Sequence, residues 1–406
     1  MASTVPMARP TADRLSMNWI VNKKADLMLF IGGALTGYIM FFLHAGLHLN
    51  MLTVWFIWVV FIDTPHFYST YLRTYFDKEE WHSRKKLLVG SLGWLLVGPA
   101  FIGLSYLLYV SGVQIYAAPF IIFIIGFNLW AYWHVVRQHY GILSLYKRKN
   151  NDFDEPDTRI DKVFLYGGLI APFLTFAIRH PEARQLFGLP AAFPPYPEGS
   201  VFSMAFLSQL HWEHVVVFLS VTFMIIISVL FFYRQYQRWR SGLTLNVPKI
   251  LFFIALIPLY SYINYSPAVT TAPLIAFTAF VTIYHDVQYH AIVWFYSQNR
   301  YHRPGVDKKK YGLAVKLSQN FAIYAFAGIA MAALLRVTGS LFDVTPGLSP
   351  IFTTSEISLF GNISTSDLLL SFVIGIPLHH YFVDQFIWRP SKDKTLQQDL
   401  KMAKEA

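Results

Sequence analysis

Apolar residues in this chain gather in long, nearly uninterrupted runs that are separated by shorter polar stretches. A run of roughly 17 to 25 apolar residues is long enough to cross a lipid bilayer as an α-helix. The pattern therefore predicts an all-α fold, a polytopic integral membrane helical bundle with about ten transmembrane helices. The predicted spans are residues 27–47, 51–68, 87–110, 113–136, 160–178, 213–233, 249–265, 267–290, 312–335 and 365–388.

The positions of lysine and arginine predict how the spans are oriented across the membrane, because the cytoplasmic loops of membrane proteins accumulate basic residues. Of the 33 basic residues, 30 lie on one side, in or next to the stretch before the first span and the loops after the even-numbered spans, and the opposite side holds only Arg179, Arg184 and Arg336. Both termini are therefore expected in the cytosol. We expect a cytosolic arm at 1–26, a transmembrane catalytic bundle at 27–389 and a cytosolic tail at 390–406.

The amino-acid composition is that expected of a membrane protein, and it excludes several kinds of chemical site. The chain is 55% hydrophobic and only 14% charged, whereas soluble domains are about 25% charged. The net charge of +10 follows the loop pattern, and no basic soluble module of domain size is present to bind nucleic acid. The absence of cysteine excludes disulfides, iron–sulfur clusters, thiolate metal sites and cysteine nucleophiles. Any metal site must use histidine and carboxylate.

Histidines recur at the cytosol-proximal ends of four even-numbered spans, in IDTPHFY at 62–68, WHVVRQHYG at 133–141, YHDVQYHAIVWF at 284–295 and PLHHYFVD at 377–384. Ionisable groups at that depth are costly, so they normally face the bundle interior, pair with one another and mark a functional site. The pattern predicts a metal centre. Its candidate ligands are His66, His134, His139, His285, His290, His379 and His380.

Helix geometry limits which of these histidines can bind one ion. Residues five apart are rotated by about 140° and displaced by about 7.5 Å, so the two histidines of WHVVRQH, or of HDVQYH, do not easily chelate one ion unless a π-bulge intervenes. The adjacent His379 and His380 are about 100° apart. The arrangement favours a dinuclear centre. The alternative is one ion, with the remaining histidines either supporting its ligands or contacting the substrate.

Three carboxylates and one guanidinium accompany the histidines as candidate catalytic residues: Asp63, Asp286, Asp384 and Arg137. Asp63 lies three residues before His66 and Asp384 four after His380, so each shares a helix face with its histidine. Such a carboxylate either binds the metal or accepts the second N–H of the imidazole and orients it. Arg137 is a candidate for binding a polar headgroup or an anionic oxygen species, or else it marks the interface.

A second group of polar residues lies at the opposite ends of the spans: His44, His48, His211, Glu213 and His214. His44 and His48 have the i, i+4 spacing that places two imidazoles on one helix face. We interpret these residues as polar helix ends, and an outer metal site is the alternative.

The four motifs, in this order, resemble those of the Brp/Blh-type membrane-embedded carotene-cleaving dioxygenases. That resemblance implies a helical, iron-dependent protein in which His66, His134, His285 and His290 would bind iron and His379 would match the histidine before the terminal aspartate. The chain departs from the pattern: its paired histidines are five apart rather than four, and it has more spans. The resemblance therefore implies a broader class, a non-haem metal oxygenase acting on a lipophilic molecule.

The leading hypothesis is a His-rich oxygenase with two iron ions, which uses O2 to cleave, hydroxylate or desaturate a lipophilic substrate such as a carotenoid or a lipid. Zinc, copper and manganese also suit imidazole and carboxylate ligands. An electron donor is not identified by the sequence. The family resemblance implies a bacterial inner membrane as the location.

Two other classes remain open. Histidines on facing membrane helices also ligate haem in electron-transfer proteins, although a haem needs only two of them. Intramembrane histidine and aspartate also suit a transporter of metal ions or protons, although a transport path should place polar groups across the whole bilayer. Metal content and the visible spectrum distinguish these classes from an oxygenase.

Overall fold

The computed structural model describes residues 14–189, 212–340 and 357–401, and this part of the chain is almost entirely helical. Its strands are very short. β1 (Leu15–Ser16) pairs in parallel with β2 (Leu245–Asn246), and β3 (Ser358–Phe360) pairs antiparallel with β4 (Ile363–Ser364). The predicted all-α class is confirmed.

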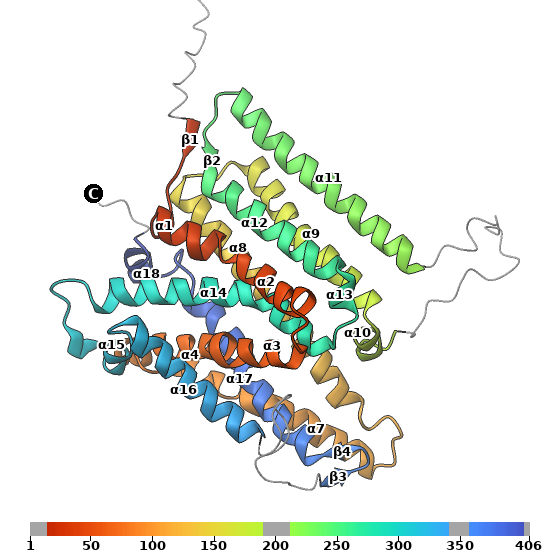
Figure 1. The fold of residues 1–406 in the computed structure, drawn as a ribbon. Coiled ribbons are helices and arrows are strands. Elements are labelled where there is room, and N and C mark those ends of the chain that lie inside the picture. Colours follow the sequence, from red (N-terminus) through yellow and green to blue (C-terminus); the bar gives the residue numbers. More distant parts are fainter. Residues whose placement is uncertain (1–13, 190–211, 341–356, 402–406) are drawn as a thin grey trace, which may run out of the picture. The chain divides into compact units, whose positions relative to one another are not determined.

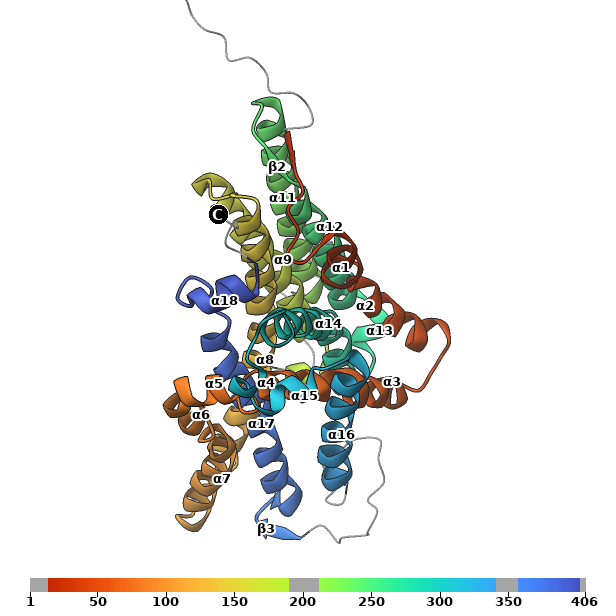
Figure 2. The ribbon, with the colours of Figure 1, turned by 90° about the vertical axis from the view of Figure 1, so that its left-hand side faces the viewer.

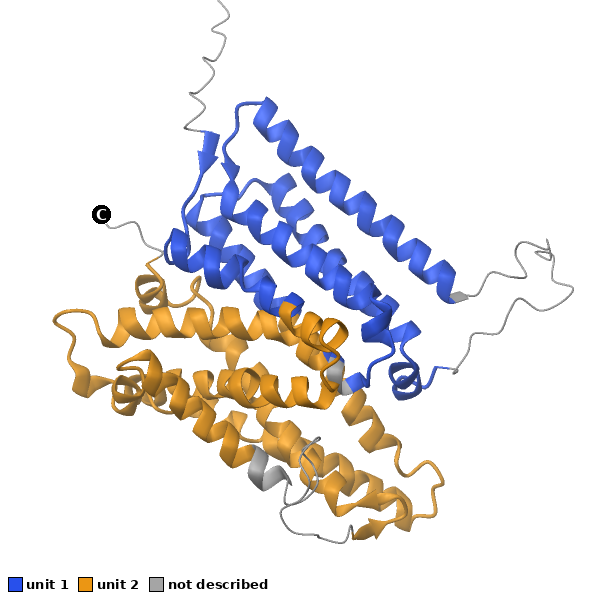
Figure 3. Cartoon of the chain, viewed as in Figure 1, with its two compact units in different colours: residues 1–38, 136–277 blue, residues 39–135, 278–406 orange. Residues whose placement is uncertain are grey.

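The chain forms two compact units, which Figure 3 shows in different colours. Unit 1 comprises residues 1–38 and 136–277, and unit 2 comprises residues 39–135 and 278–406. Three helices contribute residues to both units: α2 (Ala34–Phe41), α8 (Ala118–Lys149) and α14 (Leu274–Tyr301). Each unit is described separately below.

Unit 1 is built on three long helices, α9 (Glu155–Arg179), α11 (Trp212–Arg240) and α12 (Val247–Tyr265). α9 packs against both α11 and α12, and the three helices run side by side in Figures 1 and 2. Aromatic rings fill the contact, with Phe164 stacked 4.6 Å from Phe231 and 5.0 Å from Phe253. The shorter helical elements are α1 (Lys23–Ala25), the π-helical turn η2 (Asp26–Ile31), α10 (Pro181–Leu186) and α13 (Pro267–Thr270).

A buried ion-pair network ties the ends of the unit 1 helices together. Lys249 places its Nζ atom 2.7 Å from Asp152 and 3.1 Å from Asp161, and Lys147 also donates to Asp161. All four side chains are almost completely buried. Each buried charge thus faces an opposite charge, which is the condition under which burying it is tolerated.

Unit 2 holds two close helix pairs: α7 (Trp94–Val110) with α17 (Thr365–Ile387), and α4 (Thr64–Arg73) with α16 (Phe321–Ser340). A capping box between Ser364 and Asp367 fixes the start of α17. The other helical elements are η3 (Phe42–Gly46), α3 (Met51–Trp58), η4 (Val59–Asp63), α5 (Lys78–Ser83), α6 (Lys85–Ser91), η6 (Lys308–Lys310), α15 (Leu313–Leu317) and α18 (Lys394–Asp399).

Small residues let α7 and α17 approach closely. A Cβ atom at Gly98 would lie 2.5 Å from the carbonyl oxygen of Ser371, and one at Gly375 would lie 2.6 Å from the Cα atom of Leu95. Neither position has room for a side chain. Close backbone contact at small residues is the usual way in which membrane helices pack.

Eight helical segments of the described chain are long and apolar enough to cross a membrane: Lys23–Gly46, Met51–Arg73, Lys85–Val110, Ala118–Lys149, Glu155–Arg179, Glu213–Arg240, Val247–Tyr265 and Thr365–Ile387. Many large apolar side chains on these helices are exposed, for example Phe218 and Leu96. Exposed apolar surface on this scale is that of a membrane protein.

Candidate metal centre

Four histidines from four helices converge inside unit 2: His66 of α4, His134 of α8, His285 of α14 and His380 of α17. The ring centroid of His66 lies 4.3 Å from that of His380 and 4.9 Å from that of His285. The ring of His134 lies 5.0 Å from each of the same two rings and 6.4 Å from that of His66. All four side chains are buried.

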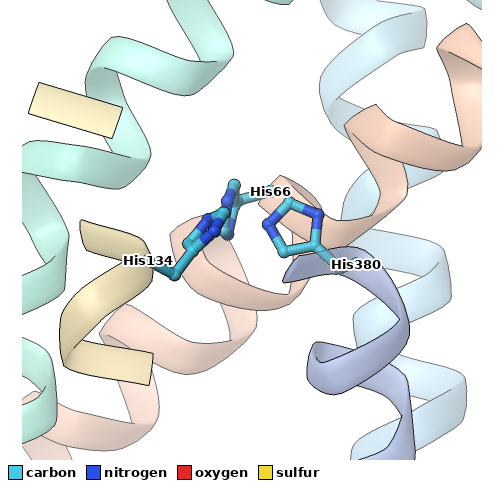
Figure 4. Close-up of side chains that lie close together, drawn as sticks. All are labelled: His66, His134 and His380. Atoms are coloured by element: carbon cyan, nitrogen blue, oxygen red, sulfur yellow. The ribbon is translucent and has the colours of Figure 1, made fainter. Parts of the chain in front are cut away.

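The ring nitrogens meet closely enough to share an ion. Ligand atoms of His66, His134 and His380 lie within 4.8 Å of one another, and the same holds for His66, His285 and Asp286. Figure 4 shows three of these imidazoles directed toward one another from α4, α8 and α17. His66 belongs to both groups.

The outer nitrogen of His380 is held by hydrogen bonds. Its Nδ1 atom lies 2.7 Å from the Oγ1 atom of Thr70, which donates a 3.0 Å hydrogen bond to Asp384. The hydroxyl of Tyr289 donates a 2.8 Å hydrogen bond to the same Asp384 oxygen. With a proton on Nδ1 donated toward Thr70, the Nε2 atom of His380 presents its lone pair to the cluster.

Asp286 faces His66 without a hydrogen bond between the two side chains. Its Oδ1 atom lies 3.4 Å from the Nδ1 atom of His66, and its Oδ2 atom accepts a 2.9 Å hydrogen bond from the indole N–H of Trp58. Trp58 thus fixes the carboxylate that faces the imidazole. A carboxylate behind a histidine orients the ring and raises its basicity as a ligand.

The hydrogen bonding of three Nε2 atoms indicates whether the cluster is suited to a metal ion. Those of His66, His134 and His380 are buried and have no hydrogen-bond partner among the described residues. An unpaired buried polar atom is costly, and structures usually satisfy it. A cation at the cluster would satisfy all three lone pairs together, and neutral imidazole is a ligand for iron, zinc and copper. The residues therefore fit a metal ion.

The other candidate histidines lie outside the cluster. His290 contacts the carbonyl oxygen of Ile62 through Nε2, at 3.0 Å, and the hydroxyl of Tyr324 through Nδ1, at 2.9 Å. His379 contacts the hydroxyl of Tyr75 at 2.7 Å. His139 belongs to unit 1, where its Nε2 atom lies 2.8 Å from the hydroxyl of Tyr260.

The geometry explains this division. α8 and α14 are α-helical through both histidine pairs, with no π-bulge between the pair members, so the second histidine of each pair points away from the first. Adjacent positions on α17 likewise diverge. One of the three π-helical turns in the described part of the chain, η4, comes just before Pro65 and His66, and π turns are frequent at functional sites.

The remaining predicted site residues take different places. Asp63 ends η4 and is buried, and neither ligand group includes it. Arg137 belongs to unit 1, where it is exposed and donates a 2.6 Å hydrogen bond to the hydroxyl of Tyr166. Asp286 and Asp384 lie beside His66 and His380, as described above.

The outer histidine group shows no metal geometry in the described part of the chain. His44 contacts the carbonyl oxygen of Leu49 at 3.3 Å, and His48 has a positive φ of 54°. His214 is exposed, and His211 lies outside the described residues. The interpretation of these residues as polar helix ends stays a prediction.

Comparisons of the chain with protein-family models, with curated proteins and with solved structures gave no match. The histidine cluster and its surroundings therefore carry the functional assignment.

Three residues of the site carry no signal that sequence analysis used: Thr70, Tyr289 and Trp58. Two of them follow a cluster histidine by four residues, Thr70 after His66 and Tyr289 after His285. That spacing places each on the helix face that already points inward. A search for hydroxyl groups at i+4 from each histidine finds both.

An apolar, aromatic surface adjoins the cluster. Tyr381 stacks on His134, with ring centroids 4.4 Å apart, and Trp130 lies 6.3 Å from Tyr381. Trp94 lies 4.8 Å from Trp130. Tyr381 also belongs to a buried cluster of α7, α8 and α17 that includes Phe123 and Leu378. The surroundings of His134 therefore favour an apolar molecule over a charged one.

Proposed function

We propose that His66, His134, His285 and His380 hold a metal ion and that the protein is a membrane-embedded, non-haem metal oxygenase. One observation carries the proposal: four buried imidazoles from four helices converge, and three of their Nε2 atoms have no partner among the described residues. A protein does not normally bury unpaired polar atoms together without a ligand for them.

Iron is the metal we propose, because four neutral imidazoles with carboxylates behind them suit Fe(II), and O2 chemistry needs a redox-active ion. Such an ion would supply the binding and activation of O2. The number of ions, two as expected from the sequence, stays a prediction. The chain itself holds the imidazoles in place through Asp286 and through Thr70 with Asp384.

The proposed substrate is a lipophilic molecule from the bilayer, such as a carotenoid or a lipid. The aromatic surface of Tyr381, Trp130 and Trp94 beside His134 supports this substrate class, since it offers ring faces and no charge. The proposed reaction is O2-dependent cleavage, as in the carotene-cleaving enzymes whose motifs the chain resembles, or else hydroxylation or desaturation.

We also propose ten spans, cytosolic termini and a bacterial inner membrane. Two helices support the two additional spans: α14 has 28 residues and α16 has 20, and these correspond to about 42 Å and about 30 Å of helix. The distribution of basic residues supports the cytosolic termini.

Metal analysis of the protein purified in detergent tests the proposed function. We expect iron at one or two ions per chain and a visible spectrum without the Soret band of haem. Alanine at His134, His285 or His380 should abolish iron retention. Each variant has a matched control one to five residues away, at His139, His290 and His379, which lie outside the cluster and should keep the iron.

Other outcomes contradict the proposal. A Soret band would show a haem protein instead. Protein that retains no transition metal after mild purification and moves ions across liposome membranes would show a transporter. Equal iron loss in a cluster variant and its matched control would show that the cluster is not the binding site.

A further inference from the structure

A continuous series of aromatic rings leads away from the histidine cluster within unit 2: Tyr289, Trp388, Tyr296, Tyr301 and Tyr311. Successive ring centroids lie 6.0, 5.7, 6.2 and 5.2 Å apart in that order. The series begins at the cluster, because the ring of Tyr289 lies 4.7 Å from that of His66 and 5.5 Å from that of His380.

The four tyrosine rings are buried and Trp388 is partly buried, and the five rings come from separate parts of the chain. Three of them stand on α14, Trp388 caps the end of α17, and Tyr311 follows η6. The four tyrosines are at most 6% exposed, unlike the many aromatic residues of this chain that are exposed. Membrane-facing aromatic residues form interfacial belts, and the four buried tyrosines do not belong to such a belt.

Two tyrosines of the series donate hydrogen bonds to carboxylates. Tyr289 donates to Asp384 at 2.8 Å, and Tyr301 donates to Asp77 at 2.9 Å. A phenol loses an electron most readily when a base already accepts its hydrogen bond, because its proton can leave along that bond. Tyr289 and Tyr301 are therefore the two positions in the series where a tyrosyl radical is best stabilised.

A buried arginine lies between these two positions. The guanidinium carbon of Arg73 is 3.7 Å from the ring centroid of Trp388 and 4.5 Å from that of Tyr296. A stacked cation disfavours positive charge on a ring, so Trp388 and Tyr296 are rings through which an electron passes rather than rings on which a radical remains. Beyond them, Arg300 near Tyr301 is surrounded by Asp77, Glu79, Glu80 and Asp399.

The far end of the series reaches the protein surface. The Nζ atom of Lys310 lies over the ring of Tyr311, 5.7 Å from its centroid. Lys310 lines an open pocket of about 600 Å³ together with Lys78, Glu79, His82 and Ser83. Glu79 is paired with Arg300 and Lys310, so the pocket is lined by groups of both signs, and a small polar reductant suits it.

We propose that these five rings form an electron-transfer route between the histidine cluster and the surface at Tyr311. This inference rests on the proposed function. The oxidant is a peroxide or O2 at the cluster. Each electron that it takes leaves Tyr289, whose proton moves to Asp384, and the electron is replaced in turn through Trp388, Tyr296, Tyr301 and Tyr311.

A small polar one-electron reductant of the ascorbate class, bound at the surface, supplies the electron that finally restores Tyr311. Reduction of one peroxide to two waters takes two electrons and two protons, so the route operates twice per peroxide. Asp384 returns the proton to Tyr289 each time the electron is replaced, so the rings are regenerated, and one peroxide, two protons from solvent and two equivalents of the one-electron reductant are consumed. The route also removes oxidising equivalents from the cluster when no substrate is bound.

Spin trapping tests the route. Protein loaded with ferrous iron is treated with hydrogen peroxide and a nitroso spin trap, and adducts are located by peptide mass spectrometry. In the parent protein we expect adducts at Tyr311 and Tyr301. In Trp388→Phe and in Tyr296→Phe, the adducts at Tyr311 should fall to the level of the iron-free protein, because phenylalanine is much harder to oxidise.

Controls separate this inference from the proposed function. Trp388→Tyr should restore the adducts at Tyr311, and Trp239→Phe, an exposed residue of unit 1, should leave them unchanged. If the variants keep the iron content of the parent and the adducts at Tyr311 persist in Trp388→Phe, the route is wrong and the metal centre stands. If the parent protein retains no iron, the proposed function and the route both fail.

Discussion

Thr70 is the residue that best illustrates how the centre depends on side chains behind the ligands. It joins His380 to Asp384 and also lies 2.6 Å from the hydroxyl of Tyr289. Thr70→Val has a similar shape and removes the hydrogen bonds, so we expect metal affinity to fall by about 10- to 100-fold. Competition against a chelator measures the change.

Thr70→Ser keeps the hydroxyl and should bind metal like the parent. Ser69→Ala changes the neighbouring residue of α4, whose hydroxyl contacts Tyr324 rather than the cluster, and it should have no effect on affinity. If Thr70→Val binds metal as tightly as Thr70→Ser, Thr70 does not position His380.

The sequence predicted part of this site and left the remainder open for physical reasons. Histidine is rare in membrane spans and conspicuous there, so the converging positions could be recognised. The choice between His379 and His380 could not be made, because the rotation of α17 about its axis depends on packing against α7 and α4. Thr70 and Tyr289 could not be recognised, since neutral hydroxyls are common in such helices.

Among the helices, the contact between α7 and α17 is sensitive to a single methyl group. Gly98→Ala would place a Cβ atom 2.5 Å from the carbonyl oxygen of Ser371. We expect a loss of about 1–3 kcal/mol in the free energy of unfolding, measured by denaturant titration in detergent. α17 carries His380, so iron content should fall with it.

Gly103→Ala is the matched control in the same helix, because a Cβ atom there would meet nothing within 4 Å. Alanine is favoured over glycine in a helix interior by about 1 kcal/mol, so this variant should be as stable as the parent or slightly more stable. Equal destabilisation by both substitutions would contradict the close contact at Gly98.

The ion-pair network of unit 1 makes stability depend on pH. Burial disfavours the charged form of Asp152, but the ion pair with Lys249 outweighs it and holds the pKa of this carboxyl below its ordinary value. A lowered folded-state pKa means that the carboxylate stabilises the fold fully above the unfolded pKa of about 3.9 and progressively less as pH falls below it.

Asp152→Asn removes this dependence. The thermal unfolding midpoint of the parent should exceed that of the variant at neutral pH, and the difference should shrink as pH falls below about 4. A difference that stays constant with pH would show that Asp152 does not titrate with folding.

Helix positions followed closely from the sequence, whereas irregular helical segments did not. The apolar runs predicted most long helices because each run matches the bilayer thickness. The π-helical turns η2, η3 and η4 and the short helices α5 and α6 depend on local hydrogen bonding that composition does not encode. Of these elements, η4 directly precedes α4, which carries His66, so the orientation of His66 could not be predicted from the sequence.

For the whole molecule, the absence of cysteine allows a direct test of the proposed topology. Single cysteines at Lys309 and Lys392, and at Ser111, replace residues that are exposed or partly exposed. In intact cells, a membrane-impermeant maleimide should label Ser111→Cys and should leave Lys309→Cys and Lys392→Cys unlabelled until the membrane is opened. Labelling of Lys392→Cys in intact cells would contradict a cytosolic C-terminus.

The turn η4 has a consequence for insertions and deletions. Trp58 and His66 both contact Asp286, yet residues eight apart on a regular α-helix differ by about 80° around the axis. The wider π turn at Val59–Asp63 accommodates one extra residue, so the two side chains face the same way as if they were seven apart.

A deletion within this turn should therefore be tolerated better than an insertion. Removing Phe61, an exposed residue, lets the segment become a regular α-helix with Trp58 and His66 on one face, and iron content should persist. Adding a residue there rotates His66 by roughly a further 100° about the helix axis relative to Trp58. The two side chains then no longer face the same way, and iron retention should be abolished. The segment thus tolerates a change of length in one direction only.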